Sequence, residues 1–167
     1  MARFPTIGVA LALSLVLASC ASGGASGNPL PPSEALGRPT MSAVFATADG
    51  THSSLRVWVA ATPEARGRGL MFVRSLPANQ GMAFLEGAPS TTTFWMKNTL
   101  VPLSIAFVDA GGTVITIRDM APCPAEPCTL YSATAPYETA VEANAGWFAG
   151  HGVGVGDHLT LEPLGNA

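Results

Sequence analysis

Short segments in which apolar and polar residues alternate recur along the chain from about residue 40 to residue 163. A period of two is typical of strands that bury one face. Turn-forming pairs such as Asp49-Gly50 and Gly111-Gly112 separate the segments. About eight short strands favour a mainly β fold, a single compact β-sandwich or barrel-like domain, over a doubly wound α/β fold. The expected strands cover residues 43–47, 55–60, 81–85, 92–97, 103–108, 113–118, 138–143 and 158–161.

One or two short helices are expected beside these strands. Thr62 is a suitable N-cap and Pro63 a suitable first helical residue for a helix that continues through residues 65–71. Residues 145–150 can form a second helical turn. The expected core contains Phe94 and Met96 together with Met71, Met82, Phe84 and Phe107.

The N-terminal segment has the pattern of an export signal. Arg3 precedes an apolar run over residues 7–17. This run is too short for a membrane-spanning helix, which takes about 20 residues, and it fits the apolar region of a signal peptide. The run ends in Leu17-Ala18-Ser19-Cys20, which resembles the lipobox of bacterial lipoproteins. We expect a lipoprotein signal peptide over residues 1–19 and a lipid on Cys20; ordinary secretion and a retained membrane anchor are the alternatives.

Residues 20–39 are expected to be the lipidated cysteine and a flexible tether rich in Gly, Ser and Pro, and residues 40–167 the β-rich domain. The lipid would hold the exported protein on a membrane. Ala21 and Ser22 are neutral, as in outer-membrane lipoproteins, so in an organism with two membranes we expect the domain to face the periplasm from the outer membrane.

Composition narrows the possible partners. Charged residues make up 11% of the 167 residues and the net charge is −3, whereas an average domain carries roughly 25% charged residues. This balance excludes a charge-driven disordered tail, a coiled coil and a basic protein that binds nucleic acid. The partners that remain are a small polar ligand, an envelope protein and the membrane reached through the lipid.

Cys123 and Cys128 enclose a short Pro-rich loop. Exported proteins meet an oxidising environment, so a disulfide between the two residues is expected. A metal site and a redox-active dithiol are the alternatives. A metal site would need further ligands, and no His lies between Asp119 and Tyr137.

Five segments of the chain form a recognisable series: Arg66-Gly67-Arg68-Gly69-Leu70-Met71, Gly81-Met82-Ala83-Phe84, Phe94-Trp95-Met96-Lys97-Asn98-Thr99, Glu142-Ala143-Asn144-Ala145-Gly146 and Val155-Gly156-Asp157. Taken in this order, they resemble the domain of unknown function 192 family over about residues 55–162. The resemblance implies a single β-rich domain, often exported or linked to a membrane, and no established activity. After Pro102-Leu103 the family usually has an acidic residue, where this chain has Ser104, so a mechanism that needs that carboxylate is doubtful here.

Lys97 is the most informative candidate site residue. Strand alternation places Trp95, Lys97 and Thr99 on one face, and a lysine beside a tryptophan needs an acidic partner or open water. Glu142 and Asp157 are the candidate partners. A structural ion pair is one interpretation, and catalysis by Lys97 and Glu142 as base and acid is another. The third is a polar cleft for a small anionic or polar ligand, with ligand-binding candidates Arg74, Trp95, Lys97, Asn98, Glu142 and Asp157.

Two further sets of residues could form binding sites, and for each of them a purely structural role is the alternative. Arg66, Arg68 and Arg74 bracket a Gly-rich turn and could hold an anion, although arginines on a solvated face are more common. Methionines can bind copper(I), but in β-core positions they more often fill gaps. The methionines concerned are Met71, Met82, Met96 and Met120; the histidines His52, His151 and His158 show no paired spacing.

The sequence therefore favours a non-catalytic binding or accessory module of the cell envelope, with a polar cleft near Lys97. We expect no metal and no cofactor. A small hydrolase or lyase that uses Lys97 and Glu142 and a Met-based copper-handling protein are the alternatives.

Overall fold

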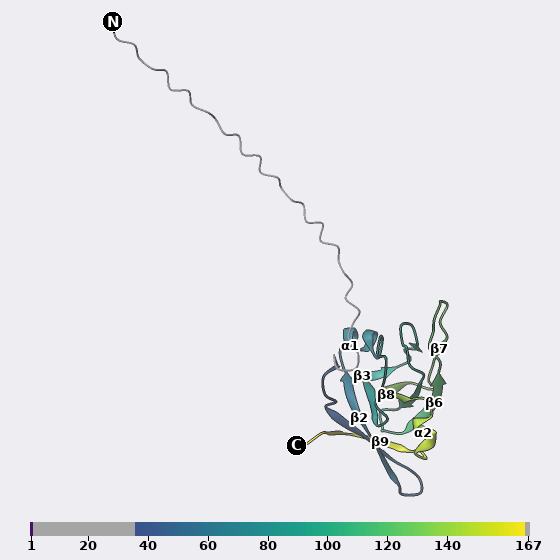
Figure 1. Cartoon of the computed structure of the whole chain (residues 1–167). Helices are drawn as coiled ribbons and strands as arrows, with labels where there is room; N and C mark the ends of the chain where they lie inside the picture. The colour runs from purple at the N-terminus through teal and green to yellow at the C-terminus, as the bar shows by residue number, and fades with distance from the viewer. Residues whose placement is uncertain (2–35, 166–167) are drawn as a thin grey trace.

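A curled, mixed β-sheet forms the frame of the molecule (Figure 1). The computed structural model describes Met1 and residues 36–165. Within that part the chain forms nine strands and two short helices, in the order β1 (Met41–Ala46), β2 (His52–Ala60), α1 (Pro63–Arg68), β3 (Gln80–Ser90), β4 (Phe94–Trp95), β5 (Leu103–Val108), β6 (Val114–Met120), β7 (Leu130–Tyr131), β8 (Tyr137–Asn144), α2 (Trp147–Gly150) and β9 (His158–Pro163). None of the helices described is long and apolar enough to cross a membrane.

Seven strands pair in the order β6-β5-β8-β3-β2-β1-β9, and β4 pairs with β7 in a separate two-stranded ribbon. All neighbours are antiparallel except β2 and β3, which α1 connects as a crossover. The two outer strands meet at one end, where the Val114 N–H donates to the Asp157 carbonyl and the Leu159 N–H donates to the Gly112 carbonyl, both at 2.8 Å. The sheet is therefore a half-barrel, closed at one end only.

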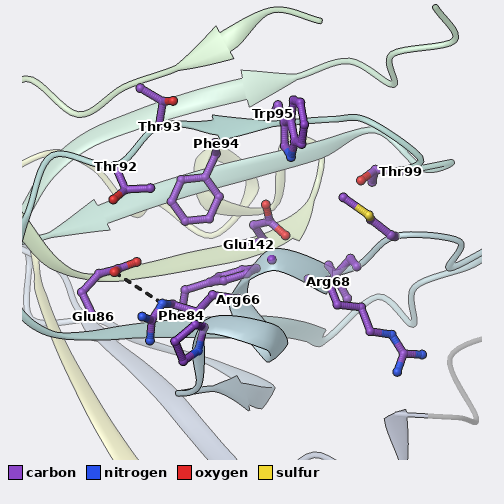
Figure 2. Close-up of a pocket in the computed structure, with 15 residues that line it drawn as sticks. Arg66, Arg68, Phe84, Glu86, Thr92, Thr93, Phe94, Trp95, Thr99 and Glu142 are labelled. Carbon is purple, nitrogen blue, oxygen red and sulfur yellow. Dashed lines mark ion pairs between the residues drawn. The ribbon is translucent and has the colours of Figure 1, made fainter.

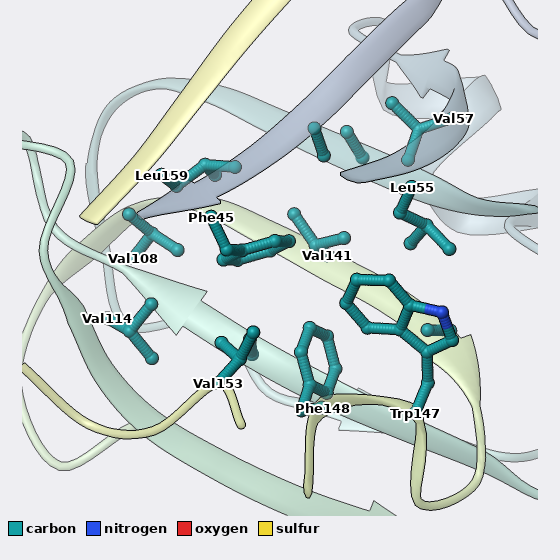
Figure 3. Packing of buried hydrophobic residues seen from close by; sticks show 14 residues of the cluster. Phe45, Leu55, Val57, Val108, Val114, Val141, Trp147, Phe148, Val153 and Leu159 are labelled. Carbon is teal, nitrogen blue, oxygen red and sulfur yellow. The ribbon is translucent and has the colours of Figure 1, made fainter. Parts of the chain in front are cut away.

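Both faces of the sheet are covered, because alternate side chains of its central strands enter two different apolar clusters. Val141 and Ala143 of β8 belong to the cluster under α2, which includes Phe45 and Trp147 (Figure 3). Ala140 of the same strand belongs to the cluster on the other face, under α1. Glu142 lies two residues after Ala140 on β8 and therefore points to the same face, among apolar side chains.

The prediction of a mainly β fold is confirmed. Eight of the nine strands overlap expected segments, but β4 has only two residues where residues 92–97 were expected to form a strand, and β7 was not predicted. The first helix stops at Arg68 instead of continuing to residue 71, because Gly69 adopts φ +48° and the chain turns there.

The expected core is correct for four of its six residues. Met82, Phe84, Met96 and Phe107 are buried, whereas Phe94 and Met71 are half-buried. The signal peptide, Cys20 and nearly all of the tether lie outside the described residues, so those expectations stay predictions.

Gly81 is the point of closest approach within the sheet. A Cβ atom at this position would overlap the carbonyl oxygen of Glu142 on the adjacent strand and lie 2.7 Å from Cδ2 of Leu55.

We expect Gly81→Ala to lower the free energy of unfolding by about 1–3 kcal/mol or more, measured by urea denaturation. The control is Gly67→Ala, because a Cβ atom there meets open space in α1; it should raise stability by about 0.5–1 kcal/mol. Equal stability of Gly81→Ala and the parent protein would contradict the close packing of β3 on β8.

Candidate functional site

A cavity of about 330 Å³ opens on the α1 side of the sheet (Figure 2). Its walls come from α1 and the turn after it, from β3 and β4, and from the loop that follows β4, while β8 forms its floor. The lining residues are Pro63, Arg66, Gly67, Arg68, Gly69, Leu70, Met71, Phe84, Glu86, Thr92, Thr93, Phe94, Trp95, Thr99 and Glu142.

Glu142 supplies the carboxyl group at the floor of the cavity. Its strand neighbours are Met82 on β3 and Ile105 on β5, both buried and apolar. The residue is 5% exposed, and its carboxyl group has no hydrogen bond or ion pair with any residue of the range 36–165. Burial disfavours the charged form and raises the pKa of Glu142 to about 8. At neutral pH the empty site therefore holds mainly a protonated carboxyl, which can both donate and accept a hydrogen bond.

Aromatic rings surround this carboxyl group. Figure 2 shows it beside the rings of Phe84 and Phe94, with Trp95 above. The Phe84 and Phe94 rings pack edge to face, with centroids 5.0 Å apart, and Phe94 also packs on Phe107 at 5.6 Å. Trp95 is 45% exposed and forms part of the cavity mouth. The site is thus an aromatic-walled pocket with an acidic group at its base.

The two arginines of the lining direct their charges away from Glu142. Arg66 forms an ion pair with Glu86 at 3.4 Å and donates to the carbonyls of Leu85 and Ala61 at 2.8 and 2.9 Å. The guanidinium group of Arg68 points away from the cavity centre (Figure 2). The cation of Arg66 is therefore already compensated, and only the stem of Arg68 contributes to the wall.

Two residues with left-handed backbone join the turn after α1 to the loop after β4. Phe72 has φ +63° and Asn98 has φ +58°, a region that bulky residues rarely adopt. The Phe72 N–H donates to the Asn98 carbonyl at 2.8 Å, and the Asn98 side-chain amide lies 3.9 Å from the sulfur of Met71. This connection holds Met71 and Thr99 at the edge of the cavity.

The structure brings together only part of the expected ligand site. Trp95 and Glu142 line the cavity, whereas Lys97, Asn98 and Arg74 do not. Asn98 and Arg74 are exposed. Of the three arginines considered for an anion site, Arg66 and Arg68 line the cavity and Arg74 does not, so the three do not form one cluster around it.

The expected partners of Lys97 are wrong. Lys97 forms an ion pair with Glu126, and its ammonium group lies 5.3 Å from the centre of the Trp95 ring. It therefore does not form an acid–base pair with Glu142. Glu126 was missed because it lies in the loop enclosed by Cys123 and Cys128, and the sequence does not show that this loop folds back onto the segment after β4.

The expected disulfide between Cys123 and Cys128 is present. Cys123 forms a β-bridge with Lys97, so the closed loop lies beside β4. The disulfide thereby holds Glu126 within reach of the lysine.

Asp157 lies at the closed end of the half-barrel and not at the cavity. Its carboxylate accepts hydrogen bonds from the N–H groups of Gly154 at 2.7 Å and Ala48 at 3.1 Å. Asp157 therefore binds backbone amides, one of them in its own turn, and its inclusion in the ligand site is not supported.

Ser104, the position at which this chain departs from the family pattern, also lies outside the cavity. The Ser104 hydroxyl donates to the Asp119 carboxylate at 2.5 Å and accepts from the Gly146 N–H at 2.8 Å. A carboxylate from the adjacent strand thus stands beside the position where an acidic residue was expected. Ser104 is not a cavity residue, so this departure leaves the cavity unchanged.

Methionines and histidines do not gather at the cavity. Met82, Met96 and Met120 are buried in the apolar cluster under α1, and Met71 lines the cavity alone among the methionines. Among the described residues, no three His, Cys, Asp or Glu side chains are placed to hold a metal ion together.

Sequence reasoning missed the contribution of Thr99. Alternation placed Thr99 on a polar face with Lys97, but the left-handed backbone at Asn98 reverses the pattern and leaves Thr99 7% exposed. Phe84 was expected only as core, yet its ring also forms a cavity wall. A local signal existed for Asn98, since asparagine is among the few non-glycine residues that tolerate this conformation.

The buried carboxyl group of Glu142 makes stability depend on pH. In the unfolded chain this group titrates near 4.5 and in the folded protein near 8. Between these values only the folded state keeps the proton, so rising pH favours unfolding by about 1.4 kcal/mol for each pH unit. The contribution of the Glu142 side chain to the free energy of unfolding is therefore most favourable below pH 4.5 and is lost as pH rises to about 8, the raised pKa of the folded protein.

We therefore expect Glu142→Gln to flatten the fall in unfolding free energy between about pH 5 and pH 8, measured by denaturant titration at several pH values. Glu138→Gln is the matched control on the same strand, because Glu138 does not line the cavity. Parallel pH profiles for the parent protein and Glu142→Gln would contradict the assignment.

Comparison with known proteins places the chain in a family. Residues 44–161 match the DUF192 family, described as "Uncharacterized ACR". A crystal structure from Sinorhizobium meliloti 1021, described as a "putative transcription regulator", is similar with 32% identity and a TM-score of 0.68, over 75% of this chain and 95% of that one. A protein of unknown function from Novosphingobium aromaticivorans DSM 12444 is similar with 32% identity and a TM-score of 0.66, over 71% and 83%. No curated protein matches. The chain belongs to the domain of unknown function 192 (DUF192) family.

Proposed function

We propose that this protein is an exported, lipid-anchored binding protein whose DUF192 domain takes up a small ligand in the cavity above Glu142, without catalysing a reaction. The observation that carries the proposal is the Glu142 carboxyl group, which is 5% exposed and has no partner among residues 36–165. The fully buried side-chain polar atom without a partner in the described chain is Nε1 of Trp147, so the Glu142 oxygens are accessible from the cavity. A ligand that donates a hydrogen bond to them would do so in surroundings of low polarity, where such a contact is strong.

The cavity has the dimensions and the lining of a ligand site. Its volume of about 330 Å³ falls within the range of roughly 300–1,000 Å³ that is usual for small-molecule pockets. Such pockets combine apolar and aromatic walls with a few polar groups that orient the ligand. Phe84, Phe94 and Trp95 are the walls here, and Glu142 and Thr99 are the polar groups.

Segments that are distant in the sequence but share the family resemblance meet at this cavity. They contribute residues 66–71, Phe84, the three residues Phe94, Trp95 and Thr99, and Glu142. The closed end of the half-barrel, with Asp157, takes no part. This convergence favours the cavity over the surface near Lys97 as the functional site.

The cavity offers little support for catalysis. Lys97 is the only lysine of the sequence and is paired with Glu126. Within residues 36–165, no lysine, histidine or cysteine lines the cavity. A reaction that uses separate acid and base groups would need a second ionisable group beside Glu142. The other lining carboxylate, Glu86, is paired with Arg66, and a binding role is the simpler function.

The proposed location is inferred from the sequence of the N-terminal segment. The segment Leu17-Ala18-Ser19-Cys20 supports lipidation at Cys20, and the neutral Ala21 and Ser22 support residence in the outer membrane, facing the periplasm, of a cell with two membranes. The disulfide between Cys123 and Cys128 fits an oxidising compartment. The role in transcription regulation given for the Sinorhizobium meliloti protein finds no support in this chain, because a net charge of −3 does not favour nucleic acid.

A thermal-shift screen of small polar compounds tests the binding role. A ligand at a hundred times its Kd stabilises the folded state by about 2.7 kcal/mol, which raises Tm by about 5 °C or more. We expect compounds that stabilise the parent protein to stabilise Glu138→Gln equally and Glu142→Gln much less. Compounds that raise Tm equally in all three proteins would place the binding site elsewhere, and a screen without any stabilising compound would contradict the binding role.

Metabolic labelling with a radioactive fatty acid tests the anchor. We expect the parent protein to incorporate label and to sediment with membranes, and Cys20→Ser to do neither, because two or more acyl chains are needed for lasting attachment. Cys128→Ser is the matched control and should still be labelled. Membrane sedimentation of an unlabelled Cys20→Ser protein would show a different mode of attachment.

A further inference from the structure

Resting on the proposed function, a second inference concerns the chemical class of the ligand. We propose that the cavity binds an organic cation: a protonated amine attached to an apolar group, with its ammonium group on the Glu142 carboxylate and its apolar part against the rings of Phe84, Phe94 and Trp95.

The carboxyl group determines which end of the ligand lies deepest. Glu142 stands at the floor with apolar neighbours on both flanking strands, Met82 and Ile105. A charge that is taken out of water requires a compensating charge or hydrogen bonds close by. An ammonium group supplies both to the carboxylate, because its N–H bonds donate while its charge opposes that of Glu142.

The aromatic walls favour a cation over an anion. The face of an aromatic ring carries negative charge density and attracts a cation within about 6 Å of its centre. Figure 2 shows the rings of Phe84, Phe94 and Trp95 near the carboxyl group of Glu142. Trp95 already makes this type of contact on its exposed side, where Lys97 lies 5.3 Å from the ring centre.

The other ionisable groups of the cavity do not oppose a cation at this point. Arg66 and Arg68 come from α1, and Glu86 comes from β3. The charge of Arg66 is compensated by Glu86 at 3.4 Å, and the Arg68 guanidinium points away from Glu142 (Figure 2). In the described part of the chain neither Glu142 nor Arg68 has an ion-pair partner, and of the two only Glu142 directs its ionisable group into the cavity (Figure 2).

Thr99 supplies a second polar contact. The residue is 7% exposed and lines the cavity, and its hydroxyl oxygen has no hydrogen-bond partner among residues 36–165. A hydroxyl oxygen can accept one N–H of an ammonium group while the Glu142 carboxylate accepts another. Once Glu142 is ionised, its carboxylate and the Thr99 hydroxyl oxygen offer two acceptors that line one cavity, which suits a donor-rich ammonium group.

Binding an amine in this way displaces a proton. The empty site holds the Glu142 proton at neutral pH, because burial raises the pKa of this group to about 8. When an ammonium ion binds, the carboxyl O–H bond breaks, its electron pair stays on the carboxylate, and the proton leaves to the solvent buffer. Each ligand bound near pH 7 should therefore release close to one proton, and affinity should rise as pH approaches 8.

A matched set of three probes tests the ligand class on the purified full-length protein: phenethylamine, 2-phenylethanol and phenylacetate. Each joins a phenyl ring to its end group through a short carbon chain, and the end group is cationic, neutral or anionic. Isothermal titration in two buffers of different ionisation enthalpy measures both affinity and proton release. We expect phenethylamine to bind the parent protein most tightly of the three probes and with proton release. Glu142→Gln should weaken the binding of phenethylamine by about 30-fold or more and change the binding of 2-phenylethanol little. Glu138→Gln should match the parent protein.

The other outcomes separate the two proposals. If 2-phenylethanol or phenylacetate binds as tightly as phenethylamine, the cation class is wrong while binding in the cavity stands. If phenethylamine binds without proton release, or equally to Glu142→Gln, Glu142 is not its partner and the inference fails. If none of the three probes binds at millimolar concentration, both the cation class and the proposed binding role are overturned.

Discussion

The burial of one carboxyl group in the middle of an apolar sheet face is the constraint on which the site depends. β8 is covered on both faces, so its central side chains enter an apolar cluster or the cavity. Glu142 lies between Met82 and Ile105 of the flanking strands and finds no polar partner in the described chain. The same environment that raises the pKa of Glu142 is the basis of the proposed binding role, because low polarity strengthens the interaction of a carboxyl group with a donor or a cation.

The other polar residues that the sequence singles out have structural roles instead. Asp157 binds backbone amides where the two outer strands meet, Ser104 connects Asp119 to the start of α2, and Lys97 holds the disulfide loop through Glu126. Each of these groups has its partners within the fold. In a chain with 11% charged residues, Glu142 differs from these three because it is buried and ionisable and has no hydrogen bond or ion pair within the described chain.

The cavity also explains why segments far apart in the sequence resemble the family together. The turn after α1 and the loop after β4 are joined through Phe72 and Asn98, both with left-handed backbone. Strained conformations of this kind cost about 1–3 kcal/mol and persist where the surrounding structure holds them. Phe72 and Asn98 hold the turn after α1 and the loop after β4 together at the rim of the cavity.

The sequence by itself determined the fold class, most strand positions and the disulfide, because period-two alternation, turn residues and closely spaced cysteines are local signals. It also singled out Glu142 and Trp95. Only the tertiary structure decided that Lys97 pairs with Glu126, that β2 runs parallel to β3, and that Thr99 turns inward after Asn98. These depend on which distant segments meet and on single backbone angles, and an alternating pattern specifies the face of a strand but not the residue that lies opposite it.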